Sequence, residues 1–293
     1  MIYRQTVLLA LIEQCGGNLS KTDLQKLLFL FCKYCGVDHY EFFPYQFGAF
    51  SLVSYYDKWK LTTQGILAET DNFVIHSGKS FISSLRKKDS IALGNFVEEV
   101  GHMRGRGLIR KTYLEYPKSS IRSEIAAQVL SAEELIAIEQ HQGQTPSEGL
   151  FTLGYEGISI DGYLNRLIQR DIKLVFDVRK NPVSRKYGFS KRSLEKNLLR
   201  VGIGYAHEPD LGIASHMRKR IQSPKDYAFL FECYAKEILP KKAGVLDRII
   251  EATKIHRRIA LTCFEANPKM CHRHRITEAI DAIASNTIPI IHI

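Results

Sequence analysis

Residues 150–177, LFTLGYEGISIDGYLNRLIQRDIKLVFD, hold the pattern that decides the fold. The apolar runs at 150–154 and 172–177 have the length of strands, and between them residues 160–170 repeat apolar side chains at helical spacing. Two parallel neighbouring strands need a connection of this kind, usually a helix. The stretch therefore predicts a strand–helix–strand unit and, with it, a parallel sheet.

The same alternation continues to the end of the chain. We expect further strands at 203–207 and 258–263, and helices at 190–201, at two or three places between 214 and 256, and at 268–284. Such alternation predicts an α/β domain over residues 149–293, with a mainly parallel sheet and helices on both faces.

The polar, turn-rich stretch 140–149 (QHQGQTPSEG) separates this part from a preceding domain at 1–140. There we expect a helix at 3–14, a helix from the N-cap Ser20 to about Cys35, and a helix from Ser51 to about Lys60. Apolar segments at 65–68 and 73–76 predict a hairpin. Helices followed by a hairpin predict a mostly α-helical, winged-helix-like domain.

Two pieces of the first domain, KTDLQKLLFLF (21–31) and YEFFPYQFGAFS (40–51), resemble the winged-helix-like module of Panacea-type antitoxin proteins. Ala49 stands where those proteins usually have proline. A helix that reads DNA projects several basic or amide side chains into the major groove. Residues 51–60 contain two basic side chains, Lys58 and Lys60, and one acidic side chain, Asp57. Binding of DNA and docking of a protein partner are both open for this domain.

The net positive charge of the chain comes almost entirely from its second half. Residues 1–147 hold 16 Lys and Arg against 15 Asp and Glu, whereas residues 148–293 hold 25 against 16. The densest basic segment spans residues 179–200, and such a stripe attracts polyanions by releasing their counterions. The alternative is a solvated surface that only aids solubility. The residues that we expect to contact nucleic acid are Lys186, Lys191, Arg192 and Lys196.

Composition and motifs exclude several classes of protein. Among the 293 residues, 45% are hydrophobic and 25% charged, as in ordinary globular proteins. The longest strongly apolar run, 27–31, is far too short for a membrane span, and Glu13 and Gln14 interrupt the apolar N-terminal stretch, which argues against a signal peptide.

Six cysteines without regular spacing predict reduced thiols in a cytoplasmic protein. The Cys32–Cys35 pair lies in an apolar helix and predicts core packing, and no ATP or NAD motif identifies a cofactor.

Polar residues follow each predicted strand, at the edge of the sheet where ligands bind in α/β proteins. We expect substrate binding there by Tyr155, Glu156, Arg179, Ser184, Arg185, Tyr205, His207 and Arg273. In particular, Arg179, Arg185 and Arg273, with the N-terminus of the last long helix, would hold a phosphate or carboxylate. The candidate catalytic residues are Asp177, Cys263, Glu265, Cys271 and His272.

The chemistry of the cysteines has three interpretations. Cys271, in the first turn of the predicted helix at 268–284, is a candidate thiolate nucleophile with His272 or His207 as its base. A metal site formed by Cys263, Cys271, His272 and His207 is the second, but the eight-residue separation of the cysteines is not a standard zinc spacing, and we assign no metal. The third is a pair of buried thiols that pack as small hydrophobes. Asp177 is interpreted as an acid or base, or as an anchor for one of the arginines.

Four motifs of the second half resemble the family called domain of unknown function 488. They are GYEG (154–157), DVRKNPVSRKYGFSK (177–191), GIGYAHEPDLG (202–212) and LTCFEANPKMCHRHRI (261–276). Family members usually have a second glycine where Ile213 stands. The resemblance implies an α/β sheet domain with a shared site and names no reaction.

Two functions are open on the sequence. One is an enzyme, a hydrolase or transferase that acts on nucleic acid (DNA rather than RNA) or on a nucleotide, in DNA modification, repair or phage defence. The other is a non-catalytic sensor or regulator that binds a nucleotide, a modified base or DNA in the same pocket. A redox switch through Cys263 and Cys271 is a third interpretation.

Overall fold

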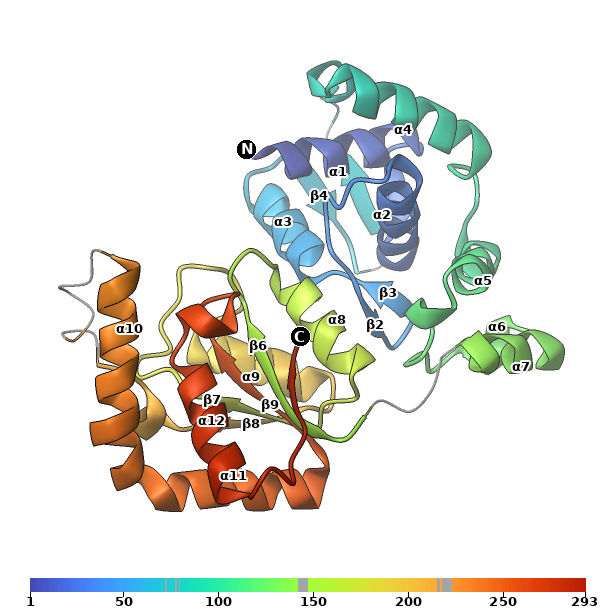
Figure 1. Ribbon diagram of the computed structural model, residues 1–293. Helices are drawn as coiled ribbons and strands as arrows, with labels where there is room; N and C mark the ends of the chain where they lie inside the picture. Colours follow the sequence, from blue (N-terminus) through green and yellow to red (C-terminus); the bar gives the residue numbers. More distant parts are fainter. Residues whose placement is uncertain (72, 77, 79, 142–146, 215–216, 218–222) are drawn as a thin grey trace. The chain divides into compact units, whose positions relative to one another are not determined.

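The computed structural model describes residues 1–71, 73–76, 78, 80–141, 147–214, 217 and 223–293. The chain divides into two compact units, Met1–Gln144 and Thr145–Ile293, and the division falls inside the polar stretch 140–149 (Figure 1). Among the described residues, the helices are all too short or too polar to cross a membrane.

The C-terminal unit is built on five parallel strands. They are β6 (Gly149–Gly154), β7 (Leu174–Asp177), β8 (Gly204–His207), β9 (Arg258–Cys263) and β10 (Ile290–His292). Their order is β10-β6-β9-β7-β8, and every neighbouring pair is parallel. The predicted parallel α/β sheet is therefore confirmed. The edge strand β10 was not predicted, because three residues are too few to show a strand period.

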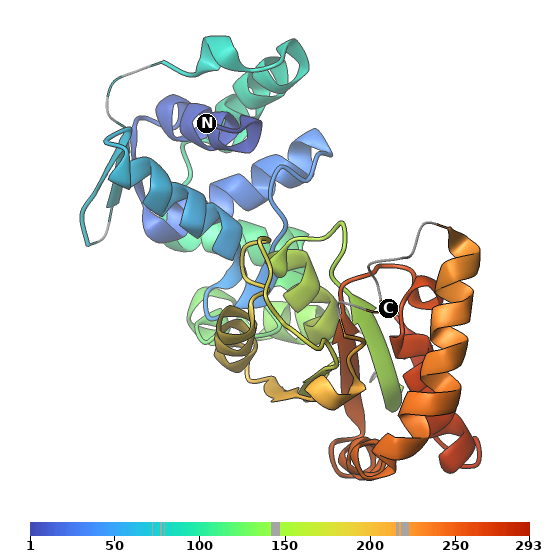
Figure 2. The same ribbon diagram turned by 90° about the vertical axis from the view of Figure 1, so that its left-hand side faces the viewer.

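Helices cover both faces of this sheet, as Figures 1 and 2 show. They are α8 (Ile160–Gln169), α9 (Lys191–Arg200), α10 (Pro224–Cys233), α11 (Ala243–His256) and α12 (Arg273–Ile283). Leu150, Phe176 and Leu261 point to one face, where they form a buried core with side chains of α10, α11 and α12. On the other face, Thr262 of β9 contacts Tyr163 of α8. Because side chains alternate between the two faces along each strand, polar and reactive residues at the strand ends lie on both sides of the same sheet edge.

Two glycines let the loops at that edge approach each other. A Cβ atom on Gly154, at the end of β6, would lie 1.8 Å from the carbonyl oxygen of Glu265. A Cβ atom on Gly212 would lie 2.1 Å from the backbone nitrogen of Lys180. Both separations are far below van der Waals contact, so only glycine permits this packing of the loops that follow β6, β7, β8 and β9.

The N-terminal unit contains α1 (Tyr3–Gln14), β1 (Asn18–Ser20), α2 (Lys21–Cys35), β2 (Phe43–Tyr45), β3 (Gly48–Phe50), α3 (Leu52–Thr63), β4 (Leu67–Glu69) and β5 (Phe73–His76). The predicted hairpin is present as the antiparallel pair β4–β5, and β1 adds to β5 in the order β1-β5-β4. Ser20 and Ser51 cap α2 and α3 by accepting hydrogen bonds from the backbone of Asp23 and Ser54. The short strands β1, β2 and β3 were not predicted.

The rest of the unit is helical, as expected. It consists of α4 (Lys87–Glu99), α5 (Gly105–Glu115), α6 (Ala126–Val129) and α7 (Ala132–His141). Pro117 begins a short 3₁₀ turn directly after α5. Ser131 caps α7, because its hydroxyl accepts a hydrogen bond from the backbone of Glu134 while the Glu134 carboxylate accepts one from the backbone of Ser131.

Candidate active site at the carboxyl edge of the parallel sheet

A pocket of about 330 Å³ opens at the carboxyl ends of the central strands. Its lining comes from the loops that follow β6, β7 and β9, with one residue from the loop after β8. The lining residues are Tyr155, Arg179, Lys180, Asn181, Val183, Ser184, Arg185, Ile213, Cys263 and Phe264. This is the edge at which ligands bind in open parallel sheets. Five of the site residues predicted from the sequence line the pocket: Tyr155, Arg179, Ser184, Arg185 and Cys263.

A buried ion pair supports the wall of the pocket. Asp177, at the end of β7, is 0% exposed and Arg179 is 7% exposed. The guanidinium donates two hydrogen bonds to the carboxylate, from Nε at 2.8 Å and from Nη2 at 2.5 Å, and Tyr205 donates a third from its hydroxyl at 2.8 Å. Burial acts to lower the pKa of Arg179, but Asp177 outweighs it and the pKa lies above its usual value. These are the contacts of an anchoring carboxylate, and Asp177 does not line the pocket.

Arg179 uses its remaining contacts to position Tyr155. Its Nη1 donates to the Tyr155 hydroxyl at 2.8 Å and to the Phe189 carbonyl at 2.9 Å. The Tyr155 ring stacks on Phe189, with ring centres 4.2 Å apart, and meets the edge of Phe264 at 5.3 Å. The arginine thus fixes an aromatic wall in addition to contributing charge.

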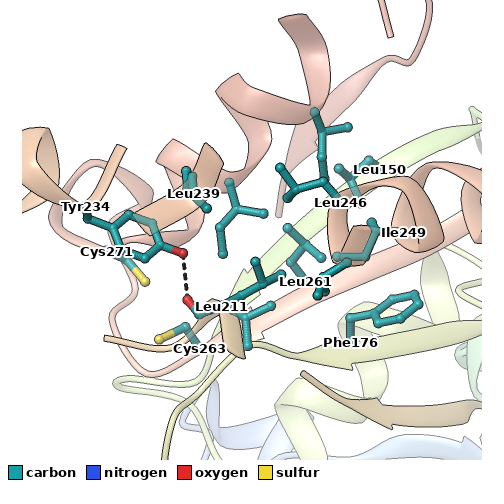
Figure 3. Packing of buried hydrophobic residues seen from close by; sticks show 14 of the residues in the cluster. Leu150, Phe176, Leu211, Tyr234, Leu239, Leu246, Ile249, Leu261, Cys263 and Cys271 are labelled. Carbon is teal, nitrogen blue, oxygen red and sulfur yellow. Dashed lines mark hydrogen bonds between the residues drawn. The ribbon is translucent and has the colours of Figure 1, made fainter. Parts of the chain in front are cut away.

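Cys263, Cys271 and His272 form a buried cluster under the pocket. They are 2%, 1% and 0% exposed. His272 Nδ1 lies 3.7 Å from Cys263 Sγ and 3.8 Å from Cys271 Sγ, and Figure 3 shows the two cysteines at the border of the apolar core. His272 Nε2 lies 3.0 Å from the Val178 carbonyl oxygen. Because a carbonyl only accepts, Nε2 carries a proton, and in the neutral ring the Nδ1 lone pair faces the two sulfur atoms.

The expectation that Cys271 lies in the first turn of a helix was wrong. Pro268–Met270 form a separate 3₁₀ turn, capped by the Asn267 side chain, and Cys271 follows it in extended conformation. Helix α12 begins only at Arg273. Burial, and then the neighbouring Cys263, raise the pKa of the Cys271 thiol well above its usual value. The predicted stabilisation of a Cys271 thiolate by a helix N-terminus is therefore missing.

Arg273 does not line the pocket, and this part of the predicted anion site was also wrong. It is buried below the loop that follows β9, where it donates hydrogen bonds to the carbonyls of Glu265 and Ala266, the latter at 2.8 Å. Its donors hold the loop in place, so they are directed away from a ligand. Of the three predicted arginines, only Arg179 and Arg185 line the pocket.

The two glutamates have different surroundings. Glu156 accepts a hydrogen bond from the backbone of Ala266 at 2.9 Å and so joins the loops after β6 and β9. The Glu265 carboxylate accepts one from the Cys263 thiol at 3.3 Å. Only Glu265 is thereby placed beside a group that can react.

The remaining predicted residues surround the loop after β7. Ser184 and Ser190 are joined by two hydrogen bonds, which fixes the loop to the start of α9. Lys186 donates to the Tyr155 carbonyl at 2.8 Å. His207 contacts the Arg179 carbonyl at 2.9 Å and the Lys191 amine at 3.2 Å. His207 is thus occupied on the far side of β7 and is not part of the cysteine cluster.

Helix α9 carries a cationic stripe. Arg192, Lys196 and Arg200 follow at intervals of four residues and are exposed, as is Lys191, while Leu194 and Leu198 are buried on the opposite side. Residues four apart lie on one face of a helix. In the part of the chain that the structure describes, these four cations form no ion pair.

Sequence reasoning did not select several residues of the pocket wall, namely Lys180, Asn181, Val183, Phe264 and Ile213. All but Ile213 lie within the four motifs of the second half, so their positions between the selected residues were the available signal. Their side chains gave no indication of which way they point.

Comparison with known proteins supports the resemblance of the C-terminal half. Residues 159–280 match the model of a family described as Domain of unknown function DUF488. This match extends from the start of α8 into α12. No curated protein and no solved structure matches the chain.

Proposed function

We propose that the C-terminal unit is an enzyme, a hydrolase or transferase, that acts on a nucleotide or on nucleic acid in the pocket at the carboxyl edge of the sheet. One observation carries the proposal: Cys263, an aromatic wall and exposed cations line the same pocket of about 330 Å³. This volume falls in the range of small-molecule sites.

The lining suits a base joined to a phosphate. Phe264 is exposed at the pocket and packs against Tyr155, which is itself buried in its stack on Phe189, so the Phe264 ring offers a firmly supported surface on which a base can stack. Arg185 is exposed, and among the described residues the ionic partner of Lys180 is Asp210, at a distance of 4.0 Å. These cations would attract the phosphate.

Because of the cationic stripe on α9, we extend the proposal from a free nucleotide to nucleic acid, with DNA preferred over RNA. Ser184 lines the pocket and is bonded to Ser190, the residue directly before α9. The cations Lys191, Arg192 and Lys196 therefore begin beside the pocket loop. A strand whose phosphates follow this stripe would bring one nucleotide to the pocket.

For the N-terminal unit we propose a winged-helix module that docks a protein partner. The order α1, β1, α2, α3, β4, β5 with the sheet β1-β5-β4 supports this module. On α3, Lys58 is buried and lies 2.5 Å from Glu69, and Asp57 is buried against Arg4, whereas Tyr55 and Trp59 are exposed. An exposed aromatic surface with few cations favours a protein over a DNA groove. The setting that we propose is DNA modification, repair or phage defence in the cytoplasm.

Binding to labelled single- and double-stranded DNA and RNA, measured across a salt series, tests the polymer. We compare Arg192→Ala/Lys196→Ala with Lys241→Ala/Lys254→Ala, which removes the same charge from exposed positions before and within α11. The first pair should lower the slope of log affinity against log salt by roughly 0.9 for each phosphate of duplex DNA that the variant no longer neutralises. The second pair should leave the slope unchanged. Equal effects of the two pairs would identify the stripe as a solubility feature.

Turnover is tested separately, by incubating the protein with nucleotides and oligonucleotides and identifying products by mass spectrometry. Cys263→Ser should abolish product formation and retain binding. Cys233→Ser, at a half-buried cysteine of α10 outside the pocket, is the control. Tight binding by the wild-type protein without any product would contradict the enzyme and support the sensor.

A further inference from the structure

We infer that Cys263, Cys271 and His272 are the protein ligands of a thiophilic divalent metal ion, zinc by preference, at the inner end of the pocket. The two Sγ atoms and Nδ1 of His272 all lie within 4.8 Å of one another, and all three residues are buried. Thiolate and imidazole are the ligands that zinc combines in proteins.

The separations fit tetrahedral coordination. With Zn–S of about 2.3 Å and Zn–N of about 2.0 Å, tetrahedral angles place a sulfur and a nitrogen ligand about 3.5 Å apart. The observed distances from His272 Nδ1 are 3.7 Å to Cys263 Sγ and 3.8 Å to Cys271 Sγ. The eight-residue spacing of the cysteines is no objection, because one ends β9 and the other lies in the extended segment before α12.

The surroundings hold the ligands in place. The proton of His272 Nε2 is directed to the Val178 carbonyl at 3.0 Å, the outer contact that orients metal-bound histidines. The backbone of Cys271 is fixed by the 3.0 Å hydrogen bond from its N–H to the Pro268 carbonyl. Two thiolates and a neutral imidazole also balance the charge of a divalent ion, so the ion and its three ligands together carry no net charge.

The site has three protein ligands among the described residues, the number found in catalytic zinc sites that keep a position open. Cys263 lines the pocket, so the open position would face the space in which the proposed function places the substrate. Glu265, whose carboxylate lies 3.3 Å from Cys263 Sγ, is beside these ligands and would serve there as a proton acceptor. The role of the metal in turnover rests on the proposed function, whereas metal binding itself does not.

Elemental analysis of the full-length protein, after dialysis against a weak chelator, tests the inference. We expect about one zinc ion per chain. After exchange for Co²⁺, we expect a thiolate-to-cobalt charge-transfer band and the visible bands of tetrahedral Co²⁺. Cys263→Ser, Cys271→Ser and His272→Gln should each lose the bound metal or shift these bands, and Cys233→Ser should retain both. The wild-type spectrum does not depend on whether a variant folds.

Three outcomes would overturn the inference. One is a folded wild-type protein without metal that gives no cobalt bands after Co²⁺ is added. Another is a Cys263–Cys271 disulfide found by mass spectrometry in protein purified without reductant. The third is retention of cobalt bands in all three ligand variants. Because metal content and spectra are measured without substrate, failure here leaves the nucleotide proposal standing, and failure of nucleotide binding leaves the metal site standing.

Discussion

Lys26 in the N-terminal unit and Arg179 in the C-terminal unit are both buried cations, but their surroundings shift their pKa values in opposite directions. Lys26 of α2 is 2% exposed, and its amine donates to the Ala49 carbonyl at 2.8 Å. Burial lowers the pKa of Lys26 to about 7. Arg179 is nearly as buried, but Asp177 keeps its pKa above the usual value. At Lys26 the buried charge is thus relieved by loss of the proton, and at Arg179 by pairing with a carboxylate.

The difference follows from what each cation does. Lys26 joins α2 to β3, and a neutral amine serves this purpose as well as a charged one. Arg179 must hold Asp177, Tyr155 and the Phe189 carbonyl together at the wall of the pocket. A guanidinium, with five donors in a rigid plane and a charge that does not titrate, suits this task. Removing the partner of each cation, or changing the pH, therefore affects the two units differently.

The largest effect is expected from Asp177→Asn. This change leaves the buried Arg179 without its carboxylate, and breaking such a pair costs about 3–5 kcal/mol. The free energy of unfolding of the C-terminal unit, from urea denaturation followed by circular dichroism at pH 7, measures the loss. Asp210→Asn, at an exposed aspartate of the same unit, should change it by less than about 0.5 kcal/mol. Equal losses for the two variants would show that the Asp177–Arg179 pair contributes no more than a surface contact.

A second effect concerns pH and the N-terminal unit. Above about pH 7 the folded chain loses the Lys26 proton, whereas the unfolded chain keeps it up to its ordinary pKa of 10.5. The unfolded state then binds more protons, so stability rises with pH by about 1.4 kcal/mol per unit. Between pH 7.5 and 9 the wild-type protein should gain about 2 kcal/mol relative to Lys26→Met, by urea denaturation at each pH. Parallel pH curves for the two proteins would contradict a lowered pKa.

The fold was largely predictable because apolar runs of four or more residues show their period. The strands β6, β7, β8 and β9 and their parallel arrangement follow from such runs and from the helices between them. Strands of three residues leave no period to detect, so β1 and β10 were missed, and β4 was predicted only because the turn residues after it and the longer β5 indicate a hairpin. The start of α12 was predicted five residues early, because the Asn267 side chain caps a short turn that Cys271 then terminates.

The sequence indicated where the candidate site lies, but it indicated much less well how the side chains of the site are arranged. Cys32 and Cys35 have motif-like spacing, yet the Cys35 thiol donates to the Cys32 carbonyl, and burial raises the pKa of Cys32 to about 12. Cys263 and Cys271 lack such spacing but meet at His272. Their meeting depends on the extended backbone at Cys271, which no local pattern predicts. The same holds for Arg273, whose side chain turns inward to the loop.

The smallest of these effects is expected from Tyr155→Phe. It removes the hydroxyl that accepts from Arg179 Nη1 and leaves the ring stack on Phe189 in place. Because Asp177 still pairs with Arg179 and Nη1 still donates to the Phe189 carbonyl, the loss should be about 1.5 kcal/mol, the low end of the range for a hydrogen bond to a charged group. Tyr34→Phe, at an exposed tyrosine of α2, is the control in the same urea experiment. A loss as large as that of Asp177→Asn would show that the Tyr155 hydroxyl stabilises Arg179 as much as the carboxylate does. A loss equal to that of Tyr34→Phe would show that the hydrogen bond contributes nothing.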